Sequence, residues 1–233
     1  MIRQYLFLLL CFFPVLLFSQ RTVTHGNVLW ANYNNSFRID SNWSILNDVQ
    51  LRTRDEWDKW SLLALRSGVA YKLNEKTILT AGFAWFGTLH YFEEKRLLAN
   101  EWRPWQELSI SSRLQSFKLI QRLRLEQRFL QTIDAGKKLH AVETRHRLRY
   151  RFEFAHPVTQ TLSLSAGNEV MVNVNYIHDT RFFDQNRLFL ALNTKVGAAT
   201  IFQLQYIRLL QYRGAANVLE KNNVFRASIH QQF

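Results

Sequence analysis

Cysteine, proline and glycine are scarce in this sequence: one Cys, three Pro and eight Gly in 233 residues. The single cysteine, Cys11, lies in an apolar N-terminal stretch, so disulfides, thiol chemistry and a Cys/His zinc site are excluded for the rest of the chain. The scarcity of proline and glycine excludes a linker-rich or disordered protein. After the N-terminal stretch no run approaches the ~18 apolar residues of a transmembrane helix, which excludes a spanning helix downstream.

Residues 1–19 have the features of a secretory signal peptide. Arg3 precedes an apolar run from Tyr5 to Phe18, and Ser19 supplies a small residue for cleavage. A membrane anchor is the alternative, but roughly 14 apolar residues fall short of the ~20 that a spanning helix needs. A lipoprotein signal at Cys11 is disfavoured because the bulky Phe12 follows it. We therefore expect a signal peptide at 1–19 and a single domain at 20–233.

Charged and bulky apolar residues alternate in two segments. In 122–129 arginine and glutamate occupy even positions, and in 143–154 they occupy odd positions, with mostly aliphatic or aromatic residues between them. A period of two is that of a β-strand with two unlike faces. After a signal peptide, such strands favour an outer-membrane barrel, in which the apolar face meets lipid and the charged face lines the interior.

The same period recurs in eleven runs, separated by short and longer breaks in turn. The expected strands are 28–39, 43–54, 60–73, 77–91, 101–113, 118–131, 141–155, 161–174, 184–195, 200–212 and 223–233. We predict an all-β fold, an antiparallel transmembrane β-barrel of about 10–12 strands with short periplasmic turns and longer extracellular loops. Because such barrels usually have an even number of strands, residues 21–27 would cross the barrel or add a twelfth strand, unless one expected strand is wrong; we favour twelve.

The apolar positions of these strands predict the outward face. It includes Leu79, Ala81, Phe83, Trp85, Leu89, Tyr91, Leu123, Leu125, Phe129, Leu148, Tyr150, Phe152, Phe202, Leu204, Tyr206, Leu210, Tyr212, Phe225, Ala227, Ile229 and Phe233. Aromatic residues near strand ends predict an interfacial girdle: Trp30, Tyr33, Trp43, Trp60, Tyr71, Tyr91, Trp102 and Tyr212. Arg208 falls on the apolar face, so we expect a bulge there or a side chain that reaches the headgroups.

A soluble lipocalin-like barrel or sandwich is the rival fold, with the charged face turned to water. The length of the strands, the aromatic residues at their ends and the final Phe233 favour the membrane barrel.

The inward face is rich in arginine and glutamate. The expected lumen network is Glu101, Arg103, Glu107, Arg122, Arg124, Glu126, Arg128, Glu143, Arg145, Arg147, Arg149, Arg151, Glu169 and Arg187, and the same parity places Asp48, Arg52, Arg66 and Arg226 inward. Neighbouring strands would pair these charges, and side chains can fill a barrel of this size. We favour a structural plug of salt bridges; the alternative is an anion-attracting pore or small-solute transporter.

A lipid-modifying enzyme is a third class, because such enzymes use a histidine with a serine and an acid near the rim. The histidines are scattered at positions 25, 90, 140, 146, 156, 178 and 230, and no Gly-x-Ser-x-Gly motif occurs. We therefore expect no catalytic, metal-binding or cofactor-binding residues. The formal charge of +12 comes from arginines spread over many strands, so we expect no nucleic-acid partner.

Five stretches stand out as motifs: EWRPWQE at 101–107, RLRLEQRF at 122–129, RHRLRY at 145–150, NE at 168–169 and FDQNR at 183–187. They resemble a family of Gram-negative outer-membrane proteins known as domain of unknown function 2490, and the resemblance covers nearly all of residues 20–233. It implies an outer-membrane barrel and no particular activity, since the family has no assigned catalytic residues. Pro104 inside a strand is a departure from the pattern and predicts a bulge or irregularity.

These observations predict residence in the cell outer membrane. The expected partners are outer-membrane lipids, lipopolysaccharide and the barrel insertion machinery, which would recognise the C-terminal Phe233. The oligomeric state stays open.

Overall fold

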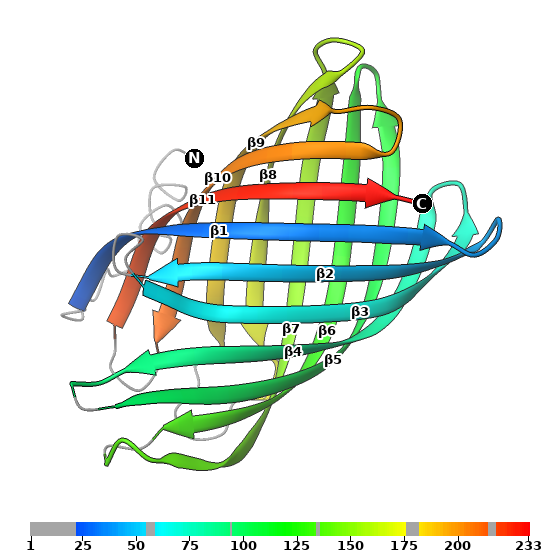
Figure 1. Ribbon diagram of the computed structural model, residues 1–233. Helices are drawn as coiled ribbons and strands as arrows, with labels where there is room; N and C mark the ends of the chain where they lie inside the picture. The colour runs from blue at the N-terminus through cyan, green and yellow to red at the C-terminus, as the bar shows by residue number, and fades with distance from the viewer. Residues whose placement is uncertain (1–21, 55–58, 94, 134–135, 176–181, 214–217) are drawn as a thin grey trace, which may run out of the picture.

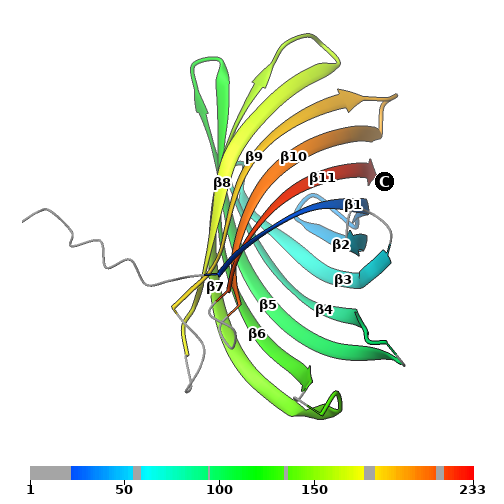
Figure 2. The same cartoon turned by 90° about the vertical axis from the view of Figure 1, so that its left-hand side faces the viewer.

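A computed structural model describes residues 22–54, 59–93, 95–133, 136–175, 182–213 and 218–233; the expected signal peptide 1–19, Cys11 and His178 lie outside these ranges. The described chain forms one sheet of strands that closes into a barrel (Figures 1 and 2). The strands are β1 (Thr22–Arg38), β2 (Trp43–Arg54), β3 (Lys59–Asn74), β4 (Thr77–Tyr91), β5 (Arg96–Leu114), β6 (Phe117–Ile133), β7 (Leu139–Pro157), β8 (Leu162–Asn173), β9 (Phe183–Lys195), β10 (Thr200–Arg213) and β11 (Val218–Gln232). The prediction of an all-β barrel of about 10–12 strands is confirmed. The described residues include no helix long and apolar enough to cross a membrane, a finding that does not concern crossing by strands.

The barrel closes through one parallel pair of strands. Successive strands pair antiparallel, and β1 pairs with β11 in parallel, from Thr22 opposite Val218 to Ser36 opposite Gln232. With eleven strands the first and last run in the same direction, so only a parallel pairing can close the sheet. The expected twelfth strand is therefore wrong for the described residues, because 22–27 extend β1 instead of forming a strand of their own.

The connections differ at the two ends of the barrel. Breaks 39–42, 75–76, 115–116, 158–161 and 196–199 lie at one end, called the turn end; the opposite ends of the strands are called the loop end. At the turn end, Asp40 Oδ1 accepts the backbone N–H groups of Asn42 (2.7 Å) and Trp43 (2.8 Å). These two donors stabilise the carboxylate and lower the pKa of Asp40 below its usual value.

Exposure of side chains follows the two-residue period. On β6, Leu123 and Leu125 are 43% and 38% exposed, whereas Glu126, the next residue of the same strand, is 1% exposed. Phe129 on β6 and Tyr150 on β7 are exposed on the same outer face. The molecule thus has an apolar exterior and a polar interior, the reverse of a soluble domain.

Two aromatic residues of the expected girdle lie elsewhere. Trp30 is buried inside the barrel, because β1 begins at Thr22 and position 30 is therefore in mid-strand and of inward parity. Tyr212 near the end of β10 is also buried and lines the internal cavity, so its predicted outward position is wrong.

Arg208 and Pro104 are accommodated without a shift of register. The β10–β11 pairing is continuous through Arg208, whose Nη1 donates to Asn223 Oδ1 at 2.6 Å, so the expected bulge is absent there. Pro104 and Arg103 leave a gap in the pairing of β5 with β6, as expected of a residue without a backbone donor, but the register on either side is unchanged.

Glycines make room for one large interior side chain. Gly68 and Gly82 face each other across β3 and β4, and the indole of Trp105 from β5 lies over them. A Cβ atom on Gly82 would lie 2.5 Å from Trp105 Cζ2 and closer still to the carbonyl oxygen of Ser67. Trp105 can therefore lie flat against the wall and leave the centre of the barrel to charged side chains.

Candidate functional site: the barrel lumen

The pairing of β6 with β7 places arginines directly opposite one another. Arg122 faces Arg151, Arg124 faces Arg149, and Arg128 faces Arg145; Glu126 is opposite Arg147. Like charges in opposed positions of a sheet destabilise it unless carboxylates lie between them. The acidic residues of these and the adjoining strands therefore decide whether the lumen can hold its arginines.

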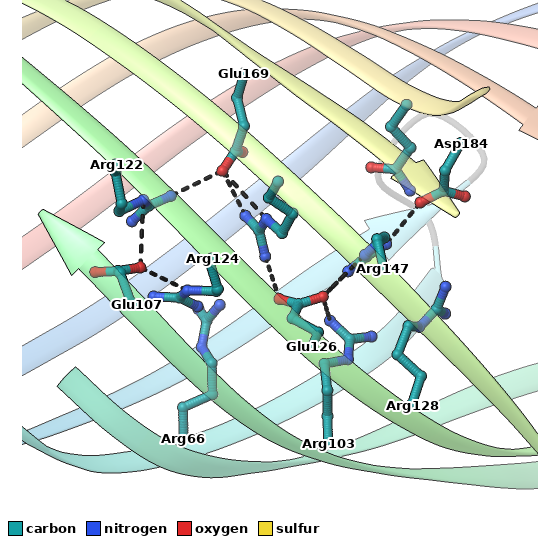
Figure 3. A network of polar contacts seen from close by, with 12 residues as sticks. Arg66, Arg103, Glu107, Arg122, Arg124, Glu126, Arg128, Arg147, Glu169 and Asp184 are labelled. Carbon is teal, nitrogen blue, oxygen red and sulfur yellow. Dashed lines mark hydrogen bonds and ion pairs between the residues drawn. The ribbon is translucent and has the colours of Figure 1, made fainter. Parts of the chain in front are cut away.

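Glu126 is the centre of this arrangement (Figure 3). Its Oε2 accepts hydrogen bonds from Nη2 (2.5 Å) and Nε (2.8 Å) of Arg147, and its Oε1 accepts one from Nη1 of Arg149 (2.6 Å). Arg103 approaches Oε2 from β5 at 3.4 Å. All four residues are buried. One carboxylate thus holds guanidinium groups from two strands in charge-assisted hydrogen bonds.

Other carboxylates continue the contacts on both sides. Glu169 on β8 forms ion pairs with Arg149 (N–O distance 2.7 Å) and Arg122 (2.8 Å), and Glu107 on β5 forms one with Arg124 (2.6 Å). Near the loop end, Glu101 accepts Arg128 at 2.6 Å and Arg103 at 2.7 Å. The connected set, called the network below, consists of Glu101, Arg103, Glu107, Arg122, Arg124, Glu126, Arg128, Arg147, Arg149, Glu169, Asp184 and Arg187.

The structure brings eleven of the fourteen expected lumen residues into the network. The other three form separate pairs: Arg145 with Glu143 at 2.6 Å near the loop end, and Arg151 with Glu153. Arg151 lies opposite Arg122 and Glu169 in the sheet, but within the described residues no hydrogen bond or ion pair joins these two pairs to the network.

Asp184 is a network member that the alternation did not predict. Its Oδ2 accepts Nη1 of Arg147 at 2.8 Å. The β8–β9 register shifts at this point, with Met171 opposite Gln185 and Val172 opposite Phe183, so Asp184 is the extra residue of a β-bulge. A bulge turns a side chain to the other face, which is why parity alone missed Asp184. Its position in the Asp-Gln-Asn-Arg motif was the only signal in the sequence.

Several of the arginines stack on aromatic rings inside the barrel. Arg103 lies over Phe86 (3.9 Å from Cζ to the ring centroid), Arg124 over Trp105 (4.1 Å) and Arg151 over Phe189 (4.4 Å). Such cation–π contacts hold a guanidinium group flat while its edge still donates hydrogen bonds. The rings and the carboxylates together fix the arginines in defined positions.

A large cavity lies beside the network. Its volume is about 1910 Å³, and its lining on β1 runs from Thr24 near the loop end to Ser36 near the turn end. On β11 the lining likewise runs from Glu220 to Gln232, whereas on β9 it stops at Arg187. The network therefore borders the cavity on one side, along β5 to β9, called the network wall. The side along β11, β1 and β2, where the lining extends over most of the strand length, is called the open wall. These walls lie on opposite sides of the barrel in Figure 1.

Arginine is in excess among the residues that line this cavity. Thirteen arginines line it: Arg52, Arg54, Arg66, Arg103, Arg122, Arg124, Arg128, Arg145, Arg147, Arg149, Arg151, Arg187 and Arg226. The seven acidic residues are Asp48, Glu101, Glu107, Glu143, Glu169, Asp184 and Glu220. A low-dielectric wall strengthens the field of such an excess, which attracts anions and repels cations. No group of three His, Cys, Asp or Glu side chains among the described residues could hold a metal ion.

The barrel and its charged lumen define a porin-like β-barrel. A solved structure of the NanC porin in a rhombohedral crystal form has a similar fold, with a TM-score of 0.53 and 10% sequence identity over 88% of this chain and 99% of that chain. The family model described as "Protein of unknown function (DUF2490)" matches residues 27–220, so this chain belongs to that family. No curated protein matches the sequence.

Proposed function

We propose that this protein is an integral outer-membrane barrel that lets small anionic solutes pass along its open wall. The observation that carries the proposal is the cavity, which is lined from near one end of β1 to near the other and in which arginines outnumber acids. A lumen completely filled by salt bridges would leave no such space. The plug interpretation therefore applies to the network wall alone.

In this proposal the network has a structural role. Its central residues are buried and paired, so their charges are largely neutralised and their side chains have fixed positions. Fixed side chains narrow the lumen to a defined width, which a row of unpaired, mobile arginines could not do. The network would thus set the size limit for solutes, and the open wall would set the preference for charge.

The exterior supports the proposed location. Leu, Phe, Trp and Tyr side chains are exposed around the barrel, and outer-membrane lipids with lipopolysaccharide would cover them. Phe233 is 60% exposed and its ring stacks on Phe37 with centroids 4.9 Å apart. In this proposal Phe233 remains the residue that the barrel insertion machinery recognises, and no catalytic role is assigned to the lumen.

Planar-bilayer recording tests the proposal. Refolded protein should conduct in KCl, and the zero-current potential in a KCl gradient should show that chloride permeates more readily than potassium. A control at high ionic strength should weaken the preference, because salt screens the arginine field. Cation preference would contradict the proposal, and protein that inserts without conducting would restore the complete plug.

A further inference from the structure

Three arginines meet around one buried tryptophan at mid-barrel. Trp30 on β1 lies opposite Arg226 of β11 on one side and Arg52 of β2 on the other. The Cζ atom of Arg52 is 4.1 Å from the ring centroid of Trp30, and that of Arg187 from β9 is 5.2 Å away. All four side chains line the cavity. The tryptophan therefore holds two guanidinium groups close together where the open wall meets the network.

Two of these arginines lie outside the network, and the third, Arg187, joins it only through one long ion pair. Among the described residues Arg52 and Arg226 form no ion pair: Arg52 donates twice to the amide oxygen of Gln50 (2.6 and 3.0 Å), and Arg226 donates to that of Gln203 (3.3 Å). Arg187 reaches a carboxylate only at 3.5 Å.

Part of the hydrogen-bonding capacity of these arginines is unused. The Nε atoms of Arg187 and Arg226 are buried and have no hydrogen-bond partner among the described residues. A buried guanidinium donor without an acceptor is costly, so each of these groups favours an additional acceptor.

The electrostatic surroundings of Arg52 point the same way. Its strongest charge interactions are all with other arginines, namely Arg187, Arg66, Arg103 and Arg149. Bringing a cation out of bulk water into a group of cations is unfavourable unless an anion accompanies it. Within the part of the chain that the structure describes, no carboxylate forms an ion pair with Arg52, and the acids whose charges act most strongly on Arg187 and Arg226, namely Glu169 and Asp48, are already paired with other arginines. An anion from the solution can therefore balance this group.

We propose that Arg52, Arg187 and Arg226 form an oxyanion-binding site at mid-barrel, and that it selects solutes with a phosphate group or two carboxylates. The inference rests on the proposed anion pathway and names its substrate class. Guanidinium groups bind such oxygens through paired, charge-assisted hydrogen bonds, which chloride cannot exploit in the same way. Several converging arginines favour a multiply charged anion over a monovalent one. Because Trp30 and the amides hold the arginines in place, little conformational freedom is lost on binding.

Inorganic phosphate is the probe for this site. At mildly alkaline pH, added phosphate should reduce the single-channel chloride current in a saturable and voltage-dependent manner, whereas acetate at the same ionic strength should have a much weaker effect. Titration calorimetry of phosphate into the detergent-solubilised barrel gives a second readout that needs no current.

Matched variants separate a site from a general field. Arg52→Gln and Arg226→Gln should each weaken phosphate binding about tenfold, since each removes a charge-assisted hydrogen bond. Arg52→Lys should weaken it as well, although the charge is kept. The control is Arg145→Gln, which removes the same charge from the same cavity but from an arginine paired with Glu143; its effect should stay below about twofold. Heat-modifiability on gels verifies that each variant is folded.

The outcomes distinguish this inference from the proposed function. Anion preference without saturable phosphate block or calorimetric binding would overturn the site and leave the anion pathway standing. Equal weakening by Arg145→Gln and Arg52→Gln would also overturn it, because the effect would then be one of total charge. Calorimetric binding that only Arg52→Gln and Arg226→Gln weaken would support the site even in a barrel that prefers cations, in which case the proposed function alone would fail.

Discussion

The network wall and the open wall carry the same residue type, arginine, in two opposite situations. On the network wall, Arg147 and Arg149 are buried against Glu126, with N–O distances of 2.5 to 2.8 Å. On the open wall, Arg52 and Arg226 contact amide oxygens and have no ion-pair partner among the described residues. The charge of the first group is neutralised by carboxylates of the protein, while the charge of the second group acts on the cavity.

The difference shows that arginine content alone does not tell a plug from a pore. A paired, buried arginine contributes to stability and shape, and removing its partner is costly because a charge is left uncompensated. An arginine that faces water-filled space contributes little to stability and acts through its field on passing ions. Both kinds occur in one lumen, and the register of the strands decides which is which.

Among the variants that test this comparison, Glu126→Gln should cause the largest loss in the free energy of unfolding. The change leaves Arg103, Arg147 and Arg149 without their shared carboxylate, and breaking a buried ion pair typically costs about 3–5 kcal/mol. Urea unfolding of the refolded barrel in detergent measures the loss. Glu75→Gln is the control, because the Glu75 side chain is 88% exposed and its contact with Lys72 should be worth about 0–1 kcal/mol. Equal losses in the two variants would mean that the network is hydrated and not structural.

A somewhat smaller effect is expected from an arginine placed outside the barrel. Leu125→Arg puts a charge in the middle of β6 on the outer face and should destabilise the barrel in lipid vesicles by about 2–4 kcal/mol. Asn34→Arg is the control, since Asn34 lines the cavity on the open wall, where a further arginine would be hydrated. Unfolding titrations measure the free energy of unfolding of both variants. A larger loss of stability for Asn34→Arg than for Leu125→Arg would reverse the assignment of faces.

A still smaller loss in the free energy of unfolding is expected from Gly82→Val. Gly82 lies on β4, between the open wall and the network wall. The new side chain meets the indole of Trp105, and overpacking of this kind costs about 1–3 kcal/mol. Ala81→Val on the outer face is the control and should change the free energy of unfolding by less than about 0.5 kcal/mol. Displaced indole should also narrow the cavity, so single-channel conductance should fall in Gly82→Val and not in Ala81→Val.

Much of the barrel is predictable from the sequence because its two faces differ so strongly. The alternation along the eleven runs predicted the strands and their faces, and with them all network residues except Asp184, since a period of two leaves only one assignment of parity. Asp184 was missed because a bulge reverses parity locally. The parallel closure was missed because the sequence has no turn or motif that marks pairing between β1 and β11, which are far apart in the chain.

The division of the lumen into two walls was also beyond the sequence. The alternation in their own strands predicts that Arg52 and Arg147 both point inward. Nothing in their neighbouring residues distinguishes the arginine with an ion pair from the one without. The difference arises from which strands lie beside them in the closed sheet: β6 supplies Glu126 to Arg147, while β1 supplies Trp30 to Arg52. Pairing across the sheet, and not local sequence, sets the role of each arginine.

The zero-current potential in a KCl gradient, compared between Arg52→Gln and Arg147→Gln, tests the central claim most directly. Each variant removes one arginine from the lining of the same cavity, so total charge is matched. The account predicts that Arg52→Gln reduces chloride preference clearly while Arg147→Gln leaves it nearly unchanged in the folded fraction. Equal shifts in the two variants, or a larger shift in Arg147→Gln, would contradict the division of the lumen into a structural wall and a conducting wall.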